Sequence, residues 1–340
     1  MSRCTAIGKQ EGKSMKPERI ELCQKFTPIQ RLKGEVYQKV WIKRDDYTGI
    51  EFSGNKIRKL EYSIKEAQSL NANVLITCGG IQSNHARATV AAARKLGLKV
   101  HLVLRGEQPT SFIGNHFLDE IMDAEITYLN SDEFVHHNEY MYLLKTRYEK
   151  AGENAYIIPM GASNGIGNFG YANVYEEILE QEKALGICFD AIVCAVGSGG
   201  TFAGLNLGKI ITRSNKAIIG FNISSTRQAF IDTTKLILKQ SLKYLDSFES
   251  DEIINTLEYN IIDGYVGGGY AIADNLLLLN IKKLAREEGL ILDPVYTGKA
   301  FFGMMDQMNK DLACYENILF IHTGGLYGLF PYESAFRALK

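Results

Sequence analysis

Three cations crowd one helical turn near the start of the chain. In the stretch SGNKIRKLEY, Lys56 directly follows a Ser-Gly-Asn turn, and Arg58 and Lys59 lie in the same turn of the expected helix. The N-terminus of a helix carries the positive end of its dipole, which disfavours ammonium groups. The pKa of Lys56 should therefore fall, which increases the fraction of neutral amine, the form needed for imine formation. A solvated surface lysine is the alternative, and this stretch alone leaves both interpretations open.

A glycine-rich loop with two hydroxyls follows an apolar, strand-like run. The loop reads VGSGGT and comprises Val196, Gly197, Ser198, Gly199, Gly200 and Thr201. Its glycines let backbone N–H groups converge, and its hydroxyls add donors, which suits a phosphate at a helix N-terminus. It lacks the Gly-Lys-Ser/Thr of a Walker A loop, and Phe202 stands where a Rossmann fingerprint needs glycine. We interpret it as the anchor of a phosphorylated cofactor, with a purely structural turn as the alternative.

A second loop, TCGGIQSNHAR at 77–87, gathers three polar side chains. Gln82, Ser83 and Asn84 follow an apolar run and precede an expected helix at 84–96. Ser83 or Asn84 can cap that helix, but three adjacent polar side chains exceed what a cap requires. We expect this loop to contact a ligand, and a simple capped turn is the alternative.

Two further loops near the C-terminus carry polar groups. Tyr296 and Thr297 end the stretch ILDPVYT, ahead of an expected helix at 298–310. Thr323 lies in HTGG, directly after the last expected strand. Each loop is weak evidence by itself, because a tyrosine before a helix is more often a packing residue.

Short β-rich runs alternate with amphipathic helices along the chain. Strands are expected at 73–78, 99–104, 125–129, 155–160, 190–196, 217–223 and 317–322. Helices are expected at 84–96, 134–150, 171–185, 227–245, 275–288 and 298–310. This alternation predicts an α/β fold of mostly parallel, twisted sheets with helices on both faces. Such sheets bind ligands beyond the carboxyl ends of their strands, where the four loops fall.

Composition argues against several classes of protein. The formal net charge of the 340 residues is -1, which argues against a nucleic-acid partner. No apolar run approaches the roughly 18 residues of a membrane span, and the N-terminal stretch lacks the apolar core of a signal peptide. Six cysteines without C-x-x-C spacing favour a reduced, cytoplasmic location, and no metal is expected because the histidines show no ligand spacing.

Taken together, the motifs resemble one family of enzymes. SGNKIRKLEY, GGIQSNHAR, GASN, VGSGGTFAGL, LDPVYTGKAFFGM and HTGG occur here in the same order as in the D-cysteine desulfhydrase and 1-aminocyclopropane-1-carboxylate deaminase family. The resemblance runs from about residue 20 to the C-terminus. It implies a two-lobed, tryptophan-synthase-β-like fold (fold type II), the cofactor pyridoxal 5'-phosphate and a small amino acid as substrate.

The same resemblance implies roles for residues around the cofactor. Lys56 would form the imine with the cofactor, and Lys59 with the loop at 196–201 would hold its phosphate. Asn84 would bond the phenolic oxygen of the cofactor, and Thr323 would also contact the cofactor.

A second set of implied roles concerns the substrate. Ser83 and Gln82, together with Asn84, would face the substrate carboxylate and α-carbon. Tyr296 and Tyr270 match the two active-site tyrosines, although a proline common beside the latter is missing.

Two positions distinguish reactions within the family. The cyclopropane deaminases carry Glu and Leu at the positions of Thr297 and Thr323. With a threonine at both positions, this chain resembles the desulfhydrases instead. The resemblance also implies that Thr297 lies in the substrate site. A carboxylate near the ring nitrogen makes a stronger electron sink than a threonine, and a weaker sink suffices to eliminate a thiolate. D-cysteine desulfuration is therefore favoured. The alternatives are a cyclopropane-carboxylate deaminase, a cysteate sulfo-lyase and an amino-acid racemase or dehydratase; a nucleotide-binding module is the non-enzymatic alternative.

The order of the motifs also predicts the domain organisation. A polar tail is expected at 1–16, a large cofactor-binding lobe at 17–59 and 171–340, and a small lobe at 60–170. The phosphate loop and Lys56 then share one lobe, and the loop with Ser83 approaches from the other. A homodimer is expected from the family resemblance.

Overall fold

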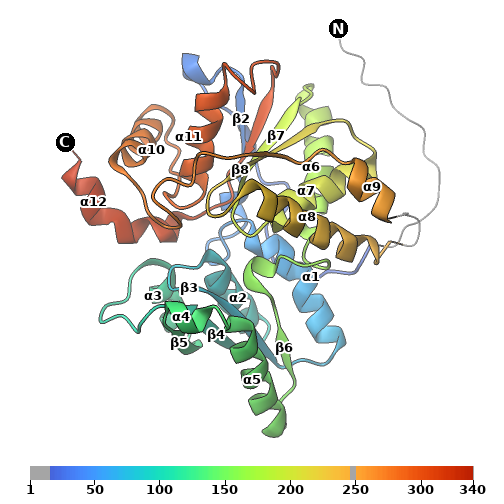
Figure 1. The fold of residues 1–340 in the computed structure, drawn as a ribbon, viewed down its shortest axis with the longest axis vertical. Coiled ribbons are helices and arrows are strands. Elements are labelled where there is room, and N and C mark those ends of the chain that lie inside the picture. Colours follow the sequence, from blue (N-terminus) through green and yellow to red (C-terminus); the bar gives the residue numbers. More distant parts are fainter. Residues whose placement is uncertain (1–15, 246–249, 340) are drawn as a thin grey trace.

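Two separate β-sheets form the framework of the structure, and helices cover both faces of each (Figure 1). This computed structural model describes residues 16–245 and 250–339. The six-stranded sheet, in the order β1-β2-β10-β7-β8-β9, comprises β1 (Ile29–Arg31), β2 (Val40–Lys43), β7 (Ala191–Val196), β8 (Ala217–Asn222), β9 (Asn260–Ile262) and β10 (Ile318–Ile321). The four-stranded sheet, in the order β5-β4-β3-β6, comprises β3 (Val74–Gly80), β4 (Lys99–Arg105), β5 (Glu125–Leu129) and β6 (Ala155–Ile157). Every pair is parallel except β1 with β2.

The helices fall into two groups along the chain. The helices that follow the four-stranded sheet are α6 (Phe169–Leu185), α7 (Gly200–Thr212), α8 (Arg227–Leu242), α9 (Ser250–Thr256), α10 (Asn275–Glu288), α11 (Thr297–Gln307) and α12 (Glu333–Ala338). Those around the four-stranded sheet are α1 (Lys56–Ser69), α2 (Asn84–Lys95), α3 (Gly114–Ile121), α4 (Ser131–Phe134) and α5 (His137–Lys150). Short 3-10 turns are η1 (Glu35–Tyr37), η2 (Asp45–Tyr47), η3 (Met160–Ala162) and η4 (Leu326–Tyr332).

Apolar side chains on alternate strand positions make the cores on both faces of each sheet. In β7, Val193 packs with α10 and α11, whereas Ile192 and Cys194 pack with α6 and α7 on the other face. In the four-stranded sheet, Leu75 packs with α1 and α2, and Ile76 packs with α4 and α5. Burial on both faces explains why these strands read as continuous apolar runs.

The expected elements are mostly observed, with two kinds of difference. The seven expected strands correspond to β3–β8 and β10, whereas the three- and four-residue strands β1, β2 and β9 were not predicted. The helix expected at 134–150 begins three residues later, as α5, and the separate short helix α4 precedes it. A capping box at Asn130 starts α4, and the ring of His137 bonds the carbonyl of Phe134 at 2.8 Å, which ends it. Side-chain hydrogen bonds of this kind compete with helix continuation.

The domain division expected from the motifs remains a prediction. The six-stranded sheet takes its strands from 29–43 and 191–321, and the four-stranded sheet takes its own from 74–157. Helix α1 crosses the expected boundary at residue 59 and packs against both α2 and α6. The tail expected at 1–16 lies, except for its last residue, outside the described residues.

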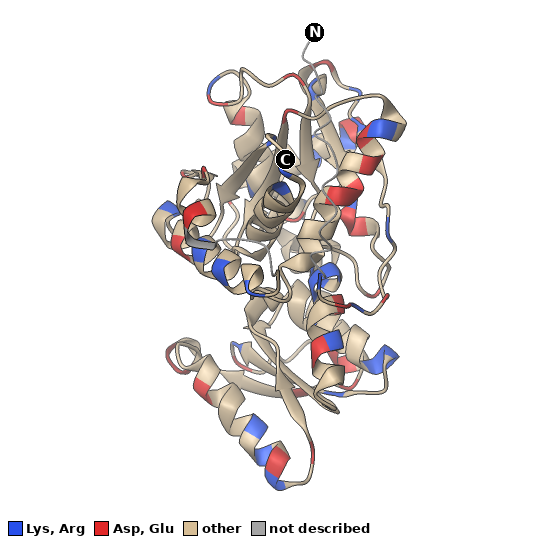
Figure 2. Ribbon diagram, turned by 90° about the vertical axis from the view of Figure 1, so that its right-hand side faces the viewer, with Lys and Arg blue, Asp and Glu red and all other residues tan. Residues whose placement is uncertain are grey.

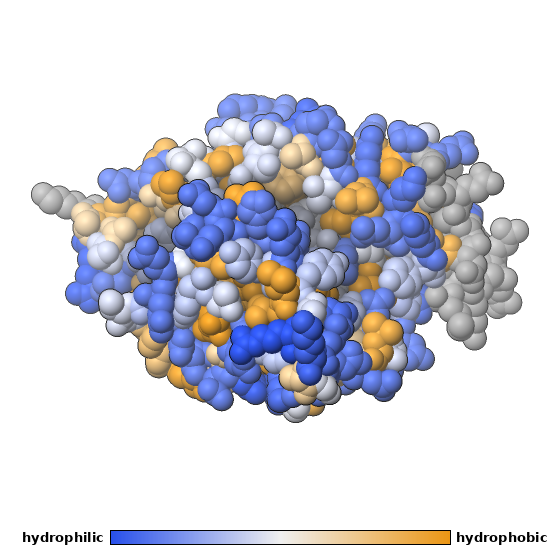
Figure 3. Space-filling view, turned by 60° about the horizontal axis from the view of Figure 1, so that its bottom comes forward, coloured by the Kyte–Doolittle hydropathy of each residue, from blue (hydrophilic) through white to orange (hydrophobic). Residues whose placement is uncertain are grey.

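The outer surface mixes both signs of charge. Lys and Arg alternate with Asp and Glu along the outer helices, while the strands carry few charges (Figure 2). A face that includes the four-stranded sheet's end of the molecule carries apolar patches between hydrophilic residues (Figure 3). In the described ranges, no helix has both the length and the hydropathy to cross a membrane.

Candidate active site

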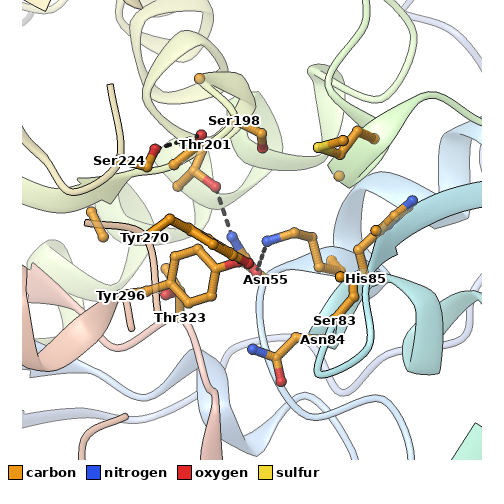
Figure 4. Close-up of a pocket in the computed structure, with 18 of the residues that line it drawn as sticks. Asn55, Ser83, Asn84, His85, Ser198, Thr201, Ser224, Tyr270, Tyr296 and Thr323 are labelled. Carbon is orange, nitrogen blue, oxygen red and sulfur yellow. Dashed lines mark hydrogen bonds between the residues drawn. The ribbon is translucent and has the colours of Figure 1, made fainter. Parts of the chain in front are cut away.

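A cavity of about 270 Å³ lies among the loops that leave the carboxyl ends of strands in both sheets. Its wall combines Lys56 on α1, the β3–α2 loop, the β7–α7 loop, two tyrosines and Thr323 (Figure 4). Residues from distant parts of the sequence thus converge, as expected for open parallel sheets.

Lys56 is the first residue of α1, and its amine reaches the cavity. Burial lowers the pKa of Lys56 to about 8, the charge of Asp293 acts in the opposite direction, and the charge of Arg87 reinforces the decrease. The amine donates to the side-chain oxygen of Asn55 at 3.0 Å, and Asn55 donates in turn to the hydroxyl of Thr201 at 2.8 Å. The direction of this pKa shift agrees with the expectation from the sequence, and its main cause is burial.

A buried ammonium lies one turn along the same helix. Lys59 is fully buried, and its amine contacts the hydroxyl of Ser163 at 3.1 Å. Among the described residues it has no carboxylate partner, and burial lowers its pKa well below the ordinary range, as does the charge of Lys56. A buried cation without a counter-ion indicates a site for an anion.

The β7–α7 loop completes a cradle for that anion. A side chain at Gly200, the first residue of α7, would come within 2.7 Å of the Lys59 amine, and Gly199 has a φ of +78°. The hydroxyl of Ser198 lies 2.9 Å from that of Ser163, and Gly197, Ser198, Gly199 and Thr201 line the cavity. A glycine cradle, a helix N-terminus and an uncompensated lysine fit the phosphate of pyridoxal phosphate. Val196 and Gly200 do not line the cavity themselves.

The β3–α2 loop forms the opposite wall. Ser83 caps α2 by accepting from the N–H of Ala86 at 3.1 Å, and it also lines the cavity with Asn84. The side-chain oxygen of Asn84 accepts from Asn115 at 3.0 Å, which fixes its orientation. Gln82 points elsewhere: its amide bonds the backbone of Ile113 and Asn115, so it does not line the cavity.

Two tyrosines form a hydrogen bond with each other at the edge of the cavity. The hydroxyls of Tyr270 and Tyr296 lie 2.5 Å apart, and the Lys56 amine lies 5.8 Å from the Tyr296 ring centroid. Burial raises the pKa of Tyr296 well above its ordinary value, so this phenol keeps its proton and can donate it. The sequence signal for Tyr270 was weak, and the structure brings it into the cavity wall.

Thr297 and Thr323 lie in different surroundings. Thr323 lines the cavity, and its carbonyl accepts from the N–H of Asn55 at 3.1 Å. Thr297 is buried behind the cavity wall, where its hydroxyl donates to Asp293 at 2.6 Å. Its predicted contact with the substrate therefore has no direct geometric support in this conformation. Asp293 also accepts from the N–H groups of residues 295–297, so it orients Tyr296.

Several residues of the cavity wall were not assigned from the sequence. They include Asn55, His85, Arg105, Phe134, Met160 and Ser224. Asn55 lies within the motif SGNKIRKLEY and His85 within GGIQSNHAR, so the sequence contained a signal for both residues. Burial lowers the pKa of His85 well below its ordinary value, and Thr77 bonds its Nε2 at 2.8 Å, so the imidazole is neutral. Within the described part of the chain, no cluster of three His, Cys, Asp or Glu residues could hold a metal.

The fold and the cavity define a pyridoxal-phosphate-dependent enzyme of fold type II. The chain belongs to the pyridoxal-phosphate dependent enzyme family, whose sequence model matches residues 20–324. It is a pyridoxal-phosphate-dependent lyase. When bound, this cofactor supplies an aldehyde for covalent attachment and a ring that accepts electrons. The fold class, the enzyme class and the cofactor predicted from the sequence are confirmed.

Known relatives cover nearly all of the chain. A Thermotoga maritima protein, provisionally named a 1-aminocyclopropane-1-carboxylate deaminase, is 43% identical over 318 residues, 92% of this chain and 97% of the relative. The mitochondrial bifunctional D-cysteine desulfhydrase/1-aminocyclopropane-1-carboxylate deaminase of Arabidopsis thaliana is 38% identical over 302 residues, 86% of this chain and 73% of that protein. The crystal structure of an ACC deaminase homologue is 37% identical, with a TM-score of 0.85, and covers 96% of this chain and 97% of that chain.

Proposed function

We propose that the enzyme catalyses β-elimination on a small amino acid, and that its substrate is D-cysteine. The reaction converts D-cysteine and water to pyruvate, hydrogen sulfide and ammonia. The observation that carries the choice is Thr323 in the cavity wall, with Thr297 buried outside that wall against Asp293. Neither side chain supplies a carboxylate to the ring nitrogen of the cofactor, so the electron sink suits a good leaving group such as a thiolate.

The proposed roles follow from the contacts of each residue. Lys56 carries the cofactor and moves the α-proton, because its amine has a pKa of about 8 and reaches the cavity. Ser83 and Asn84 bind the substrate carboxylate from the rigid N-terminus of α2. Tyr296, paired with Tyr270 at 2.5 Å, holds a proton that it can deliver to the reacting atoms.

Opening of the ring of 1-aminocyclopropane-1-carboxylate is the second candidate reaction. The tyrosine pair favours it, since a phenol that keeps its proton can serve as an acid or as a base. Cysteate sulfo-lyase, racemase and dehydratase activities share the same residues and remain further alternatives.

A side-by-side assay tests the proposed reaction. The purified holoenzyme is given D-cysteine, L-cysteine, D-serine, cysteate and 1-aminocyclopropane-1-carboxylate, and 2-oxo acid and sulfide release are measured. We expect pyruvate and sulfide from D-cysteine in equal amounts at the highest kcat/KM. A higher kcat/KM for any other compound overturns the choice of D-cysteine.

Attachment of the cofactor to Lys56 is tested separately. Borohydride reduction of the holoenzyme should fix the cofactor to the peptide that contains Lys56, and Lys56→Ala should abolish both labelling and turnover. Labelling on Lys59, with Lys56→Ala still labelled, would show that the proposed attachment site is wrong by one helical turn.

We also propose a cytoplasmic homodimer with the two lobes predicted from the motifs. Support comes from the family resemblance and from the two separate sheets. Sedimentation of the holoenzyme should give twice the chain mass, and a monomer at micromolar concentration would contradict the dimer.

A further inference from the structure

One cation in the cavity wall has no assigned partner. Arg105 is the last residue of β4, in register with Gly80 of β3. Because parallel strands end at the same sheet edge, this register brings Arg105 beside the loop that carries Ser83 and Asn84. Arg105 lines the cavity, and its side chain is exposed.

Aromatic rings, rather than carboxylates, surround this guanidinium. Its central carbon lies 5.4 Å from the ring centroid of Tyr270 and 5.8 Å from that of Phe134. Over residues 16–245 and 250–339, the side chain of Arg105 forms no hydrogen bond or ion pair. Its five N–H donors are therefore available to a ligand.

Arg87 and Arg105 differ in whether their guanidinium donors bond other groups of the protein. Arg87 is fully buried and donates to Asn115 and to the backbone oxygens of Glu51 and Ser53. These hydrogen bonds join α2 to the segment that precedes Lys56. Arg105 has no such commitment and faces the cavity.

The charge of Arg105 reaches the reacting groups. Burial raises the pKa of Tyr270, while the hydroxyl of Tyr296 and the guanidinium of Arg105 act in the opposite direction. A group bound between Arg105 and the tyrosine pair would feel the same field. Such a field stabilises negative charge on that group.

We propose that Arg105 recognises the β-substituent of the amino-acid substrate and favours one that is anionic or leaves as an anion. This rests on the proposed function, which brings an amino acid into the cavity. There the amino group faces Lys56 and the carboxylate faces Ser83 and Asn84, so the side chain is the part left for Arg105. The substrate class is then small amino acids with a thiol, sulfonate or carboxylate on the β-carbon.

For cysteine, this charge appears as the bond to sulfur breaks. The Cα–H bond breaks and its electron pair forms the new Cα=Cβ bond, while the proton goes to the Lys56 amine. The Cβ–S bond breaks, and sulfur keeps both electrons and its own proton, leaving as HS⁻. A guanidinium beside the sulfur stabilises that anion.

Aspartate and asparagine test this inference, because they have nearly the same shape and differ in charge. Their binding to the holoenzyme is measured through the absorbance of the bound cofactor. Aspartate and asparagine are used in the same configuration, D or L, as the cysteine that the enzyme cleaves. If it cleaves neither cysteine, both configurations are measured. Wild type should bind aspartate about tenfold more tightly than asparagine, the effect of one charge-assisted hydrogen bond. Arg105→Gln should bring this ratio close to one with little change for asparagine, and Arg105→Lys should keep part of it.

Arg147→Gln is the matched control, because Arg147 is exposed on α5 of the same lobe, outside the cavity. It should behave as wild type. Equal weakening of both ligands by Arg105→Gln, or an unchanged ratio, would overturn the inference, since Arg105 would then bind the α-carboxylate or only pack. A wild type without a preference for aspartate would overturn it as well. If no amino acid is cleaved, the proposed function fails, but the binding ratio still decides the role of Arg105.

Discussion

Lys56 and Lys59 lie one turn apart on α1, but the structure gives them different surroundings. The amine of Lys56 reaches the cavity, whereas Lys59 ends behind Ser163 with its charge uncompensated among the described residues. Two lysines at the positive end of a helix are unfavourable unless an anion lies between them. A phosphate in the glycine cradle at Gly199 and Gly200 would supply that anion.

Inorganic phosphate should therefore stabilise the cofactor-free protein through Lys59. A ligand at one hundred times its Kd adds about 2.7 kcal/mol to the free energy of unfolding. Lys59→Met should lose most of this increase, measured as the shift in Tm with phosphate. Lys183→Met, at an exposed position on α6, should keep it. A phosphate effect of equal size in Lys59→Met would contradict the assignment.

The same lysine should make the stability of the cofactor-free protein depend on pH. Burial lowers the pKa of Lys59 in the folded state, so between that pKa and about 10.4 the unfolded chain binds more protons. The free energy of unfolding should therefore rise with pH in this window. Lys59→Met should flatten the rise, and equal slopes in both proteins would show that the amine is not buried.

At the scale of elements, the hydrogen bonds that begin α11 also orient a residue of the cavity wall. Asp293 accepts from three successive N–H groups and from the hydroxyl of Thr297, so one carboxylate starts the helix and orients Tyr296. Asp and Asn often start helices in this way. This arrangement leaves two interpretations of Thr297: control of the reaction, or support of the helix.

Thr297→Glu combined with Thr323→Leu separates these interpretations. A carboxylate near the ring nitrogen would strengthen the electron sink, so thiol elimination should fall and some ring opening of 1-aminocyclopropane-1-carboxylate should appear. The ratio of the two activities and the Tm are measured together. Thr297→Val is the control, because it removes only the two hydrogen bonds that the Thr297 hydroxyl makes with Asp293. An unchanged ratio with a lower Tm would leave Thr297 with a structural role alone.

At the scale of the whole molecule, a buried ion network holds α1 to the six-stranded sheet. Arg58 pairs with Asp45 at 2.8 Å and with Glu177 at 3.0 Å, and Lys43 of β2 pairs with Glu177 as well. Burial alone would raise the pKa of Asp45, but Arg58 and Lys43 hold it below its ordinary value. The network thus links α1, the helix that carries Lys56, to β2 and α6.

Arg58→Met should destabilise the protein by about 3–5 kcal/mol, because it leaves Asp45 and Glu177 buried without their partner. Denaturant unfolding of the holoenzyme measures this loss. Arg147→Met, at an exposed site, should change the free energy of unfolding by less than about 0.5 kcal/mol. A loss below about 1 kcal/mol for Arg58→Met would mean that water or another group compensates the carboxylates.

Local chemistry and periodicity were readable from the sequence. The apolar runs of β3, β4, β7 and β8 and the glycine-rich loop after β7 depend on neighbouring residues, so their types and order predicted parallel sheets and a phosphate cradle. The short strands β1, β2 and β9 were missed because, unlike the equally short β6 and β10, none of them lies in a run of four or more apolar residues.

Contacts between distant segments were decided only by the tertiary structure. Packing brings Tyr270 against Tyr296 and turns Gln82 away from the cavity toward Ile113. It also aligns Arg105 with the end of β3, which no spacing along the chain reveals. The sequence by itself determined which chemical groups the chain has and which local elements carry them. Which groups face one another depends on how two sheets and their loops pack, because those contacts join residues that are far apart in the sequence.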